Sequence, residues 1–281
     1  MTGTAGVLYV VATPIGNLQD TTARALDTLG RVAVVAAEDT RHSRKLLAHY
    51  GIGTPLLALH EHNEREQTQS LLARLAAGED VALVSDAGTP LISDPGFYLV
   101  RAARAAGLQV VAVPGASACI AALSIAGLPT DRFVFEGFLP SKHAARARRL
   151  QALQDESRTL VFYESSHRIV ACLADMVESL GGERQAVLAR GLTKTFETTR
   201  GGSLQELHDW LLADDNQQRG EFVIMVHGKS GQPESIDAAD RHVLQVLLQE
   251  LPLKQAAALA AKITGLPRNR LYDYGLERKK R

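Results

Sequence analysis

Small and polar residues follow five short apolar runs of the chain, and their types could perform chemistry. The five polar segments are Thr13–Asn17, Glu38–His42, His60–Asn63, Ser85–Gly96 and Pro114–Ala118. They supply carboxylates, hydroxyls and imidazoles, and their glycines let a backbone approach a ligand closely. One such segment indicates only a turn, but five of them at one edge of a sheet indicate a continuous ligand cleft.

Several common kinds of site are absent from these segments. The sequence contains no Gly-x-x-x-x-Gly-Lys-Ser/Thr phosphate loop, no Gly-x-Gly-x-x-Gly after the first apolar run and no Gly-x-Ser-x-Gly. His60 and His62 lie two residues apart without a third ligand at metal spacing, so we expect no metal site.

The apolar runs that precede the polar segments have the composition of strands buried on both faces. They are Val7–Ala12, Val32–Ala36, Leu56–Leu59, Val81–Val84 and Val110–Val113. Amphipathic stretches between them predict helices over Thr21–Leu29, Glu64–Ala77 and Phe97–Ala106, with Asp20 and Asn63 as caps of the first two. This alternation predicts an open α/β sheet, and ligands of such sheets bind at the carboxyl ends of the strands.

From about Asp131 the pattern changes and predicts a second α/β layer with more antiparallel pairing. Its expected strands are Phe133–Phe135, Thr159–Tyr163, Gln185–Ala189, Lys194–Arg200 and Glu221–Val226. Its expected helices are Ala144–Leu153, Ile169–Leu180 and Ser203–Leu212. After the linker Gly228–Pro233, three further helices are expected over His242–Leu251, Lys254–Thr264 and Arg268–Leu276. We therefore expect domains over residues 1–128, 129–228 and 234–281, the last a small helical domain similar to a helix-turn-helix.

The composition is that of an ordinary globular protein. The 281 residues are 46% hydrophobic, and 31 Lys and Arg balance 31 Asp and Glu, which excludes a uniformly basic nucleic-acid coat. The two cysteines exclude a disulfide scaffold and favour a reducing compartment. Because no apolar stretch is long enough to cross a membrane, we expect a soluble, cytoplasmic protein.

Several segments together resemble a known family. Val84–Gly96 looks like the signature of a branch of the tetrapyrrole methylase superfamily. The flanking strings appear in the order typical of the ribosomal RNA small subunit methyltransferase I family: Thr13–Leu18, Ala37–Arg41, Phe162–Ser165, Ala189–Arg190, Leu192–Lys194 and Gly220–Glu221. One departure is Ala116, where the family often has a proline.

This resemblance implies a class III methyltransferase fold, in which two α/β domains hold S-adenosyl-L-methionine in the cleft between them. It also implies a cytoplasmic enzyme, typically a homodimer, that methylates the ribose 2′-oxygen of a decoding-centre (P-site) cytidine in the 16S ribosomal RNA of the small subunit. The notable rivals are a corrin-type small-molecule methyltransferase of the same superfamily and a non-catalytic ribosome-binding factor.

The resemblance also implies roles for residues. The expected donor-binding residues are Pro14, Ile15, Ser85, Asp86, Ala87, Gly88, Thr89, Ile92, Ser117, Ala118, Phe162 and Tyr163. The candidates that would orient the ribose hydroxyl, accept its proton or hold a phosphate are Asp39, Arg41, Glu164, Lys194 and Glu197. Phe162 is equally suited to core packing, and Asp39 with Arg41 is equally suited to a surface ion pair.

Basic residues are concentrated in two segments that could bind RNA phosphates. Residues 140–150 contain no acid, and from Arg268 onward six basic residues stand against two acidic ones. The expected RNA-binding residues are Lys142, Arg146, Arg148, Arg149, Arg268 and Arg270. Aromatic residues make up only 5% of the chain, so we expect little recognition by base stacking.

Overall fold

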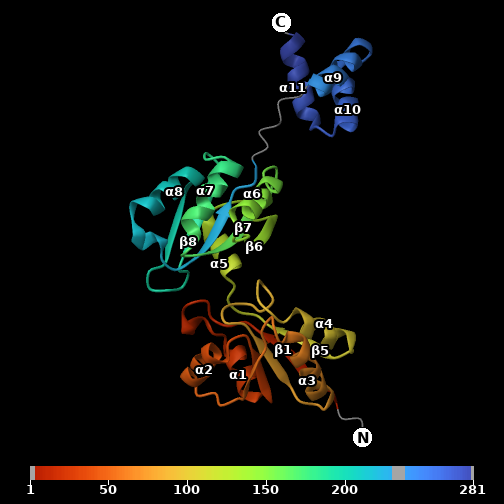
Figure 1. Ribbon diagram of the computed structural model, residues 1–281. Coiled ribbons are helices and arrows are strands. Elements are labelled where there is room, and N and C mark those ends of the chain that lie inside the picture. The colour runs from red at the N-terminus through yellow and green to blue at the C-terminus, as the bar shows by residue number, and fades with distance from the viewer. Residues whose placement is uncertain (1–3, 230–237, 280–281) are drawn as a thin grey trace. The chain divides into compact units, whose positions relative to one another are not determined.

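The computed structural model describes residues 4–229 and 238–279 (Figure 1). The chain divides into two compact units, Met1–Lys229 and Ser230–Arg281. The first unit contains both sheets. One sheet lies within the expected domain 1–128, and the other lies within the expected domain 129–228.

The first sheet consists of five parallel strands in the order β3-β2-β4-β1-β5. They are β1 (Val7–Val11), β2 (Val34–Ala37), β3 (Leu56–Ala58), β4 (Val81–Val84) and β5 (Gln109–Val113). One face is covered by α1 (Ala23–Arg31) and α2 (Thr40–His49), and the other by α3 (Glu64–Ala76) and α4 (Phe97–Ala105). Every residue of β2 and β4 is buried, which explains their continuous apolar composition and confirms the predicted open sheet.

The second sheet has the order β6-β7-β10-β8-β9, in which β6 and β7 are parallel and the other pairs are antiparallel. Its strands are β6 (Phe133–Phe138), β7 (Thr159–Ser165), β8 (Gln185–Arg190), β9 (Thr198–Ser203) and β10 (Glu221–Val226). The predicted increase in antiparallel pairing is therefore confirmed.

Alternate residues of the second sheet pack on opposite faces. Phe162, Leu188 and Ile224 pack with α6 (His143–Ala152), α7 (Ile169–Leu180) and α8 (Leu204–Ala213). The opposite face packs against α5 (Ala118–Ala126), which follows β5 of the first sheet. Helix α5 therefore joins the two sheets: it continues the chain from β5 and packs on the second sheet, in one apolar cluster with Ile15 of the loop after β1 (Figure 1).

Local hydrogen bonds move some element boundaries away from those predicted. Asp20 lies in a short 3-10 helix, η1 (Leu18–Asp20), and Thr22 caps α1 in its place by accepting from the Ala25 N–H. Asn63 makes no cap bond, because its side chain accepts from the backbone of His60. Ser203 caps α8 through a capping box with Glu206.

Two further elements differ from the prediction. The strand expected over residues 194–200 begins instead at Thr198, because backbone bonds from Lys194 to Gly191 and from Glu197 to Lys194 make the preceding residues a turn. Helix α2 was not predicted, and Asp39 caps it by accepting from the Arg41 N–H. A second 3-10 helix, η2 (Asp215–Gln218), precedes β10.

The second unit is a small helical bundle of α9 (Ala238–Glu250), α10 (Leu253–Thr264) and α11 (Arg268–Lys279). Its core contains Leu244, Leu271 and three alanines of α10. Gly275 permits close packing of α11, since a Cβ atom there would lie 2.3 Å from Leu253 Cδ1. None of the helices described in either unit is long and apolar enough to cross a membrane.

Candidate functional site

A cavity of about 380 Å³ lies between the carboxyl edge of the first sheet and the second sheet, and we call it the cleft. The loops after β1, β2, β4 and β5 all contribute to it, whereas the loop after the edge strand β3 does not. The lining residues are Ile15, Glu38, Asp86, Ala87, Gly88, Thr89, Ile92, Ser93, Asp94, Ser117, Ala118, Phe138, Tyr163, Glu164, Ser165, Leu192, Glu221, Phe222 and Val223.

Most of the expected donor-binding residues lie in the cleft. It brings together Ile15, Asp86, Ala87, Gly88, Thr89, Ile92, Ser117, Ala118 and Tyr163. Pro14 and Ser85 adjoin lining residues without lining it themselves, and Phe162 is fully buried on the far side of β7. Because successive strand residues point to opposite faces, Tyr163 enters the cleft and Phe162 enters the core.

Sequence reasoning missed several lining residues. Ser93 and Asp94 belong to the signature segment, and Glu38 and Glu221 belong to flanking strings, so those motifs could have pointed to them. Ser165 and Leu192 likewise lie in quoted strings. Phe138, Phe222 and Val223 carry no comparable signal, because they reach the cleft only through the pairing of the second sheet.

The cleft is acidic. Its lining includes the acidic residues Glu38, Asp86, Asp94, Glu164 and Glu221, of which Glu164 turns its carboxylate to the other face of β7; no lysine or arginine appears in the lining that the described residues form. Burial, followed by the charges of Glu38 and Asp86, raises the pKa of Asp94 to about 6 against the opposing hydrogen bond from Ser85. Burial and then the charge of Asp86 also raise the pKa of Glu38. This electrostatic environment favours a positively charged ligand.

The loop after β4 has a strained backbone where it enters the cleft. Leu91 and Ser93 both have φ of 72°, in the left-handed region that non-glycine residues rarely adopt. Between them Ile92 stays 40% exposed as part of the lining. Opposite, a bulge in β6 places Gly137 so close that a Cβ atom there would lie 3.0 Å from Ser93 Oγ. Such strain is typical of functional loops.

Asp39 and Arg41 form an ion pair beside the cleft. Asp39 accepts from the Arg41 guanidinium at 2.7 Å and from its backbone N–H at 2.8 Å. These bonds hold the pKa of Asp39 well below its usual range. The Asp39 N–H in turn donates to Asp86 Oδ1 at 3.0 Å, so this pair positions a lining carboxylate.

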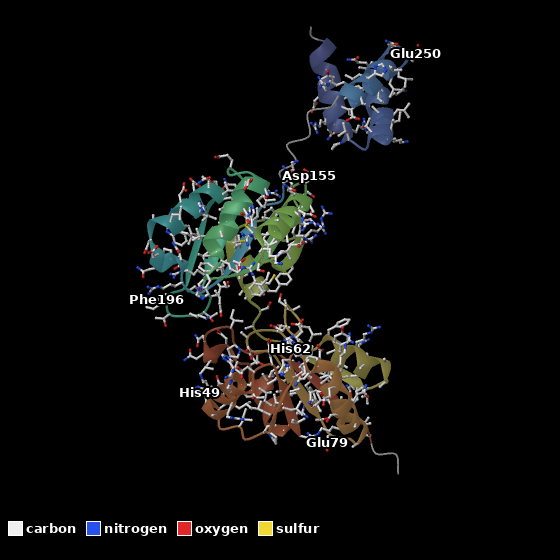
Figure 2. The ribbon with its side chains drawn as sticks, in the orientation of Figure 1. His49, His62, Glu79, Asp155, Phe196 and Glu250 are labelled. Atoms are coloured by element: carbon white, nitrogen blue, oxygen red, sulfur yellow. The ribbon has the colours of Figure 1, made fainter. Side chains whose placement is uncertain are left out.

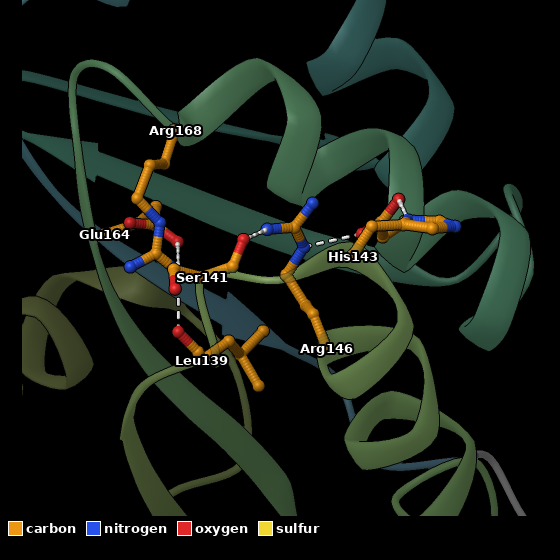
Figure 3. Close-up of polar contacts among 7 residues, drawn as sticks. Leu139, Ser141, His143, Arg146, Glu164 and Arg168 are labelled. Carbon is orange, nitrogen blue, oxygen red and sulfur yellow. Dashed lines mark hydrogen bonds and ion pairs between the residues drawn. The ribbon is translucent and has the colours of Figure 1, made fainter.

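Glu164 lies at the end of β7 in the lining of the cleft, and its side chain points to the same face of the sheet as Phe162, toward Cys172 of α7. It accepts from the Ser165 N–H at 2.8 Å and pairs with Arg168 at 3.2 Å (Figure 3). Arg168 also donates to the Leu139 carbonyl. The residue is only 1% exposed, so its carboxylate is buried beside α7 and does not face the cleft.

Tyr163 joins β7 to the start of α5. Its hydroxyl accepts from the Cys119 N–H at 3.0 Å, and its ring packs against Phe135 and Phe138. Burial is the main cause that raises the pKa of Tyr163 to about 12. The tyrosine therefore stays neutral and satisfies one of the free N–H groups at a helix N-terminus.

Lys194 and Glu197 lie outside the cleft, in the turn before β9. Lys194 pairs with the cleft residue Glu221 at 2.6 Å, and Glu197 accepts from the Thr193 N–H at 2.6 Å. Lys194 lines a second cavity of about 580 Å³, together with residues 16–19, His49, Thr193 and Thr195. His49, at the end of α2, and Phe196, in the turn, are labelled in Figure 2.

The expected RNA-binding residues differ in their accessibility. Arg146 is 5% exposed and donates to Asp175 at 2.5 Å and to the Ser141 carbonyl at 3.2 Å, while His143 contacts the same aspartate (Figure 3). Arg149 pairs with Glu136. Lys142, Arg148 and Arg268 are exposed, and Arg270 is half-buried. Arg146 therefore ties α6 to α7, and the exposed cations are the ones that could reach a phosphate.

The described residues contain no group of three or more His, Cys, Asp and Glu side chains arranged to hold a metal ion. The rings of His60 and His62 lie 6.0 Å apart. Cys119 and Cys172 are both buried as free thiols.

Solved structures with this fold include methyltransferases. A diphthine synthase superposes with a TM-score of 0.61 at 14% identity, covering 79% of this chain and 89% of that one. The uroporphyrin-III C-methyl transferase of Thermus thermophilus, complexed with S-adenyl homocysteine, gives a TM-score of 0.54 at 20% identity and covers 80% of this chain and 97% of that one. At these identities the likeness shows the fold alone.

Sequence comparison identifies the family. Residues 7–208 match the tetrapyrrole (corrin/porphyrin) methylases, and residues 234–279 match the RsmI C-terminal HTH domain. The ribosomal RNA small subunit methyltransferase I of Pseudomonas aeruginosa is 63% identical over 276 residues, covering 98% of each chain. Its counterpart in Escherichia coli O157:H7 is 54% identical over 272 residues, covering 97% of this chain and 95% of the relative. The chain therefore belongs to the ribosomal RNA small subunit methyltransferase I family, within the tetrapyrrole methylases.

Proposed function

We propose that this methyltransferase of small-subunit ribosomal RNA uses S-adenosyl-L-methionine to methylate the ribose 2′-oxygen of a decoding-centre cytidine in 16S ribosomal RNA. The observation that carries the proposal is the cleft, whose lining offers the carboxylates of Glu38, Asp86, Asp94 and Glu221 and, among the described residues, no lysine or arginine. Membership of the family supports the same reaction class.

The residues of the cleft fit this donor. Ile15, Leu192 and Val223 supply apolar walls for a purine, and the carboxylates suit the positive sulfur and the amino group. Ser117 and Ala118 stand at the N-terminus of α5, where backbone N–H groups are available for a carboxylate. When bound, S-adenosyl-L-methionine supplies the methyl group on an already activated, positively charged sulfur.

The chain's own task is to orient the ribose hydroxyl and receive its proton. Of the residues expected to orient the hydroxyl or accept its proton, Glu164 belongs to the lining of the cleft, and its buried carboxylate, paired with Arg168, acts as a positioning group that holds the end of β7. Asp39 is a positioning residue, because it is already bound by Arg41 and acts on the cleft through Asp86. Glu197 lies outside the cleft and holds the turn that carries Lys194.

We further propose that the protein acts in the cytoplasm as a homodimer and contacts the small subunit through Lys142, Arg148 and Arg268. Exposed apolar residues, among them Ile120 and Ile125 of α5, supply surface that an interface between two copies would need. Light scattering of the purified chain measures this directly, and a monomer at all concentrations would contradict the dimer.

Labelled donor and small subunits from a strain that lacks the modification test the reaction. We expect label on the ribose of one decoding-centre cytidine, located by nuclease mapping. Glu164→Gln should lower the single-turnover rate far more than donor affinity, whereas Glu178→Gln on α7 serves as a matched control outside the cleft. Absence of label in RNA would overturn the proposal, and label on a corrin precursor would favour the small-molecule rival.

A further inference from the structure

The two cavities of the first unit have opposite electrostatic character. The cleft carries four carboxylates, whereas the lining of the second cavity contains Lys194 and His49 and, within the described part of the chain, no acid. A phosphodiester would be repelled by the cleft. An RNA that delivers a ribose to the cleft must therefore place its phosphates outside it.

The second cavity lies directly beside the cleft. Ile15 lines the cleft and Gly16 lines the second cavity, and the same relation holds for Leu192 and Thr193. The Lys194–Glu221 ion pair at 2.6 Å joins the two linings, since Glu221 belongs to the cleft. One nucleotide can thus present its sugar to one cavity and its phosphate to the other.

Gly16 brings the two walls of the second cavity together. A Cβ atom at this position would lie 2.5 Å from Lys194 Cγ and 3.0 Å from the Leu192 carbonyl oxygen. The loop after β1 therefore packs tightly on the turn that carries Lys194, and this contact limits where the ammonium group can go.

The second cavity also offers uncommitted polar groups. Thr193 has a φ of 64°, which is rare for a β-branched residue, and its buried Oγ1 finds no hydrogen-bond partner among the described residues. Thr195, Gln19 and His49 add further donors to the same lining. A hydroxyl without a partner, a lysine and an imidazole are the groups that recognise a phosphate in proteins.

We propose that the second cavity holds the RNA backbone phosphate next to the methylated ribose, and that this phosphate replaces Glu221 as the partner of Lys194. The exchange releases the Glu221 carboxylate toward the cleft, which already favours cations. Arrival of RNA would thereby strengthen the hold of the cleft on the positively charged donor. The inference rests on the proposed function and names the site that recognises the RNA backbone.

Two substitutions with opposite expected effects test this site in the full-length protein. Lys194→Gln removes one phosphate contact, so the slope of log affinity against log salt should fall in magnitude by about 0.7 and affinity for small subunits about fivefold at 0.1 M salt. Glu221→Gln frees Lys194 from its ion pair and should tighten subunit binding. Lys194→Gln should leave donor affinity equal or higher, because it removes a cation near the cleft.

Lys229→Gln is the matched control, because Lys229 pairs with Asp155 (labelled in Figure 2) and lines neither cavity. Lys229→Gln should change neither the salt slope nor the affinity for small subunits. If Lys194 and Glu221 form only a structural pair, both substitutions would lower thermal stability alike and leave the salt slope unchanged, and the proposal would fall.

Subunit binding is measured with S-adenosylhomocysteine, without methyl transfer. A wild-type protein that binds subunits but never methylates them would overturn the proposed function, and the effect of Lys194 on subunit binding could still be measured. Failure of the wild type to bind subunits would overturn the site as well. Titration with inorganic phosphate at constant ionic strength should show no saturable binding; saturable binding that depends on Lys194, with subunit binding unaffected, would assign the cavity to free phosphate.

Discussion

The ionised carboxylate of Asp94 in the cleft lowers the stability of the folded protein at neutral pH. Its pKa of about 6 in the folded protein lies above the ordinary value of 3.8, so the folded state holds this proton more tightly than the unfolded chain does. This tighter binding of the proton stabilises the folded state fully below the unfolded pKa of 3.8, and the stabilisation is lost as pH rises through the folded pKa of about 6. At neutral pH the ionised carboxylate therefore opposes folding.

We predict that Asp94→Asn stabilises the protein at pH 7 and has little effect at pH 4. An amide does not ionise, so the free energy of unfolding should rise by about 1–2 kcal/mol at pH 7, after allowance for solvent screening. Urea denaturation of both proteins at the two pH values measures the difference.

Asp131→Asn is the control for this prediction, because the side chain of Asp131 is 79% exposed. Its effect should be small at both pH values. The gain from Asp94→Asn should come with weaker donor binding at pH 7, as expected where function maintains an unfavourable charge. An equal gain at both pH values would show that Asp94 is not protonated more readily in the folded state.

Among the elements, the predictable ones are those whose composition follows from burial. Both faces of β2 and β4 are covered, so these strands are continuous apolar runs that can be recognised in isolation. Helix α2 escapes this reasoning, because only Ser43, Leu46 and Leu47 are buried among its ten residues and the stretch from Thr40 to Lys45 contains no apolar residue.

The residues of the candidate site likewise divide into those that could be placed from the sequence and those that could not. The loops after β1, β4 and β5 could be placed at one edge from strand order alone, which brought Ile15, the signature segment and Ser117 together. Val223 could not be placed, because it lies within β10 and reaches the cleft only through pairing with β7 and β8. Arg146 looks like its basic neighbours in the sequence, and only the packing of α6 on α7 distinguishes it.

Helix α6 therefore carries two kinds of arginine, and we predict opposite consequences of removing them. Arg146→Ala leaves the buried Asp175 with His143 as its one remaining partner among the described residues and should lower the free energy of unfolding by about 3–5 kcal/mol. Arg148→Ala removes an exposed side chain and should change it by less than about 0.5 kcal/mol. Chemical denaturation measures both.

At a temperature where both variants are folded, Arg148→Ala should affect RNA binding more than Arg146→Ala does. Arg148→Ala should flatten the salt dependence of binding to small subunits, whereas Arg146→Ala should not. A flatter salt slope for Arg146→Ala alone would mean that the buried arginine leaves Asp175 when RNA binds.

At the scale of the whole molecule, the formal charge of zero is a sum of separated regions. The cleft is acidic, the second cavity is lined by Lys194 and His49, and the second unit exposes Lys254, Lys262 and Arg268. Such a distribution permits contact with phosphates at chosen places while the rest of the surface repels them. Affinity for RNA can then be large without uniform attraction to every nucleic acid.

Removal of the second unit separates these contributions, since each unit has its own apolar core and the first contains both cavities. A chain that ends at Lys229 should unfold cooperatively and bind S-adenosyl-L-methionine within about twofold of the full-length protein. Its binding to small subunits should weaken, and the salt slope should fall by about 2 if three phosphate contacts are lost at about 0.7 each. Titration calorimetry measures the affinity for S-adenosyl-L-methionine, and subunit binding at several salt concentrations gives the salt slope.

The full-length triple variant Lys254→Gln, Lys262→Gln and Arg268→Gln keeps the bundle and removes only charge, so it should reproduce the change in slope. An unaltered slope in both proteins would assign RNA recognition to the first unit alone, through Lys142, Arg148 and the second cavity.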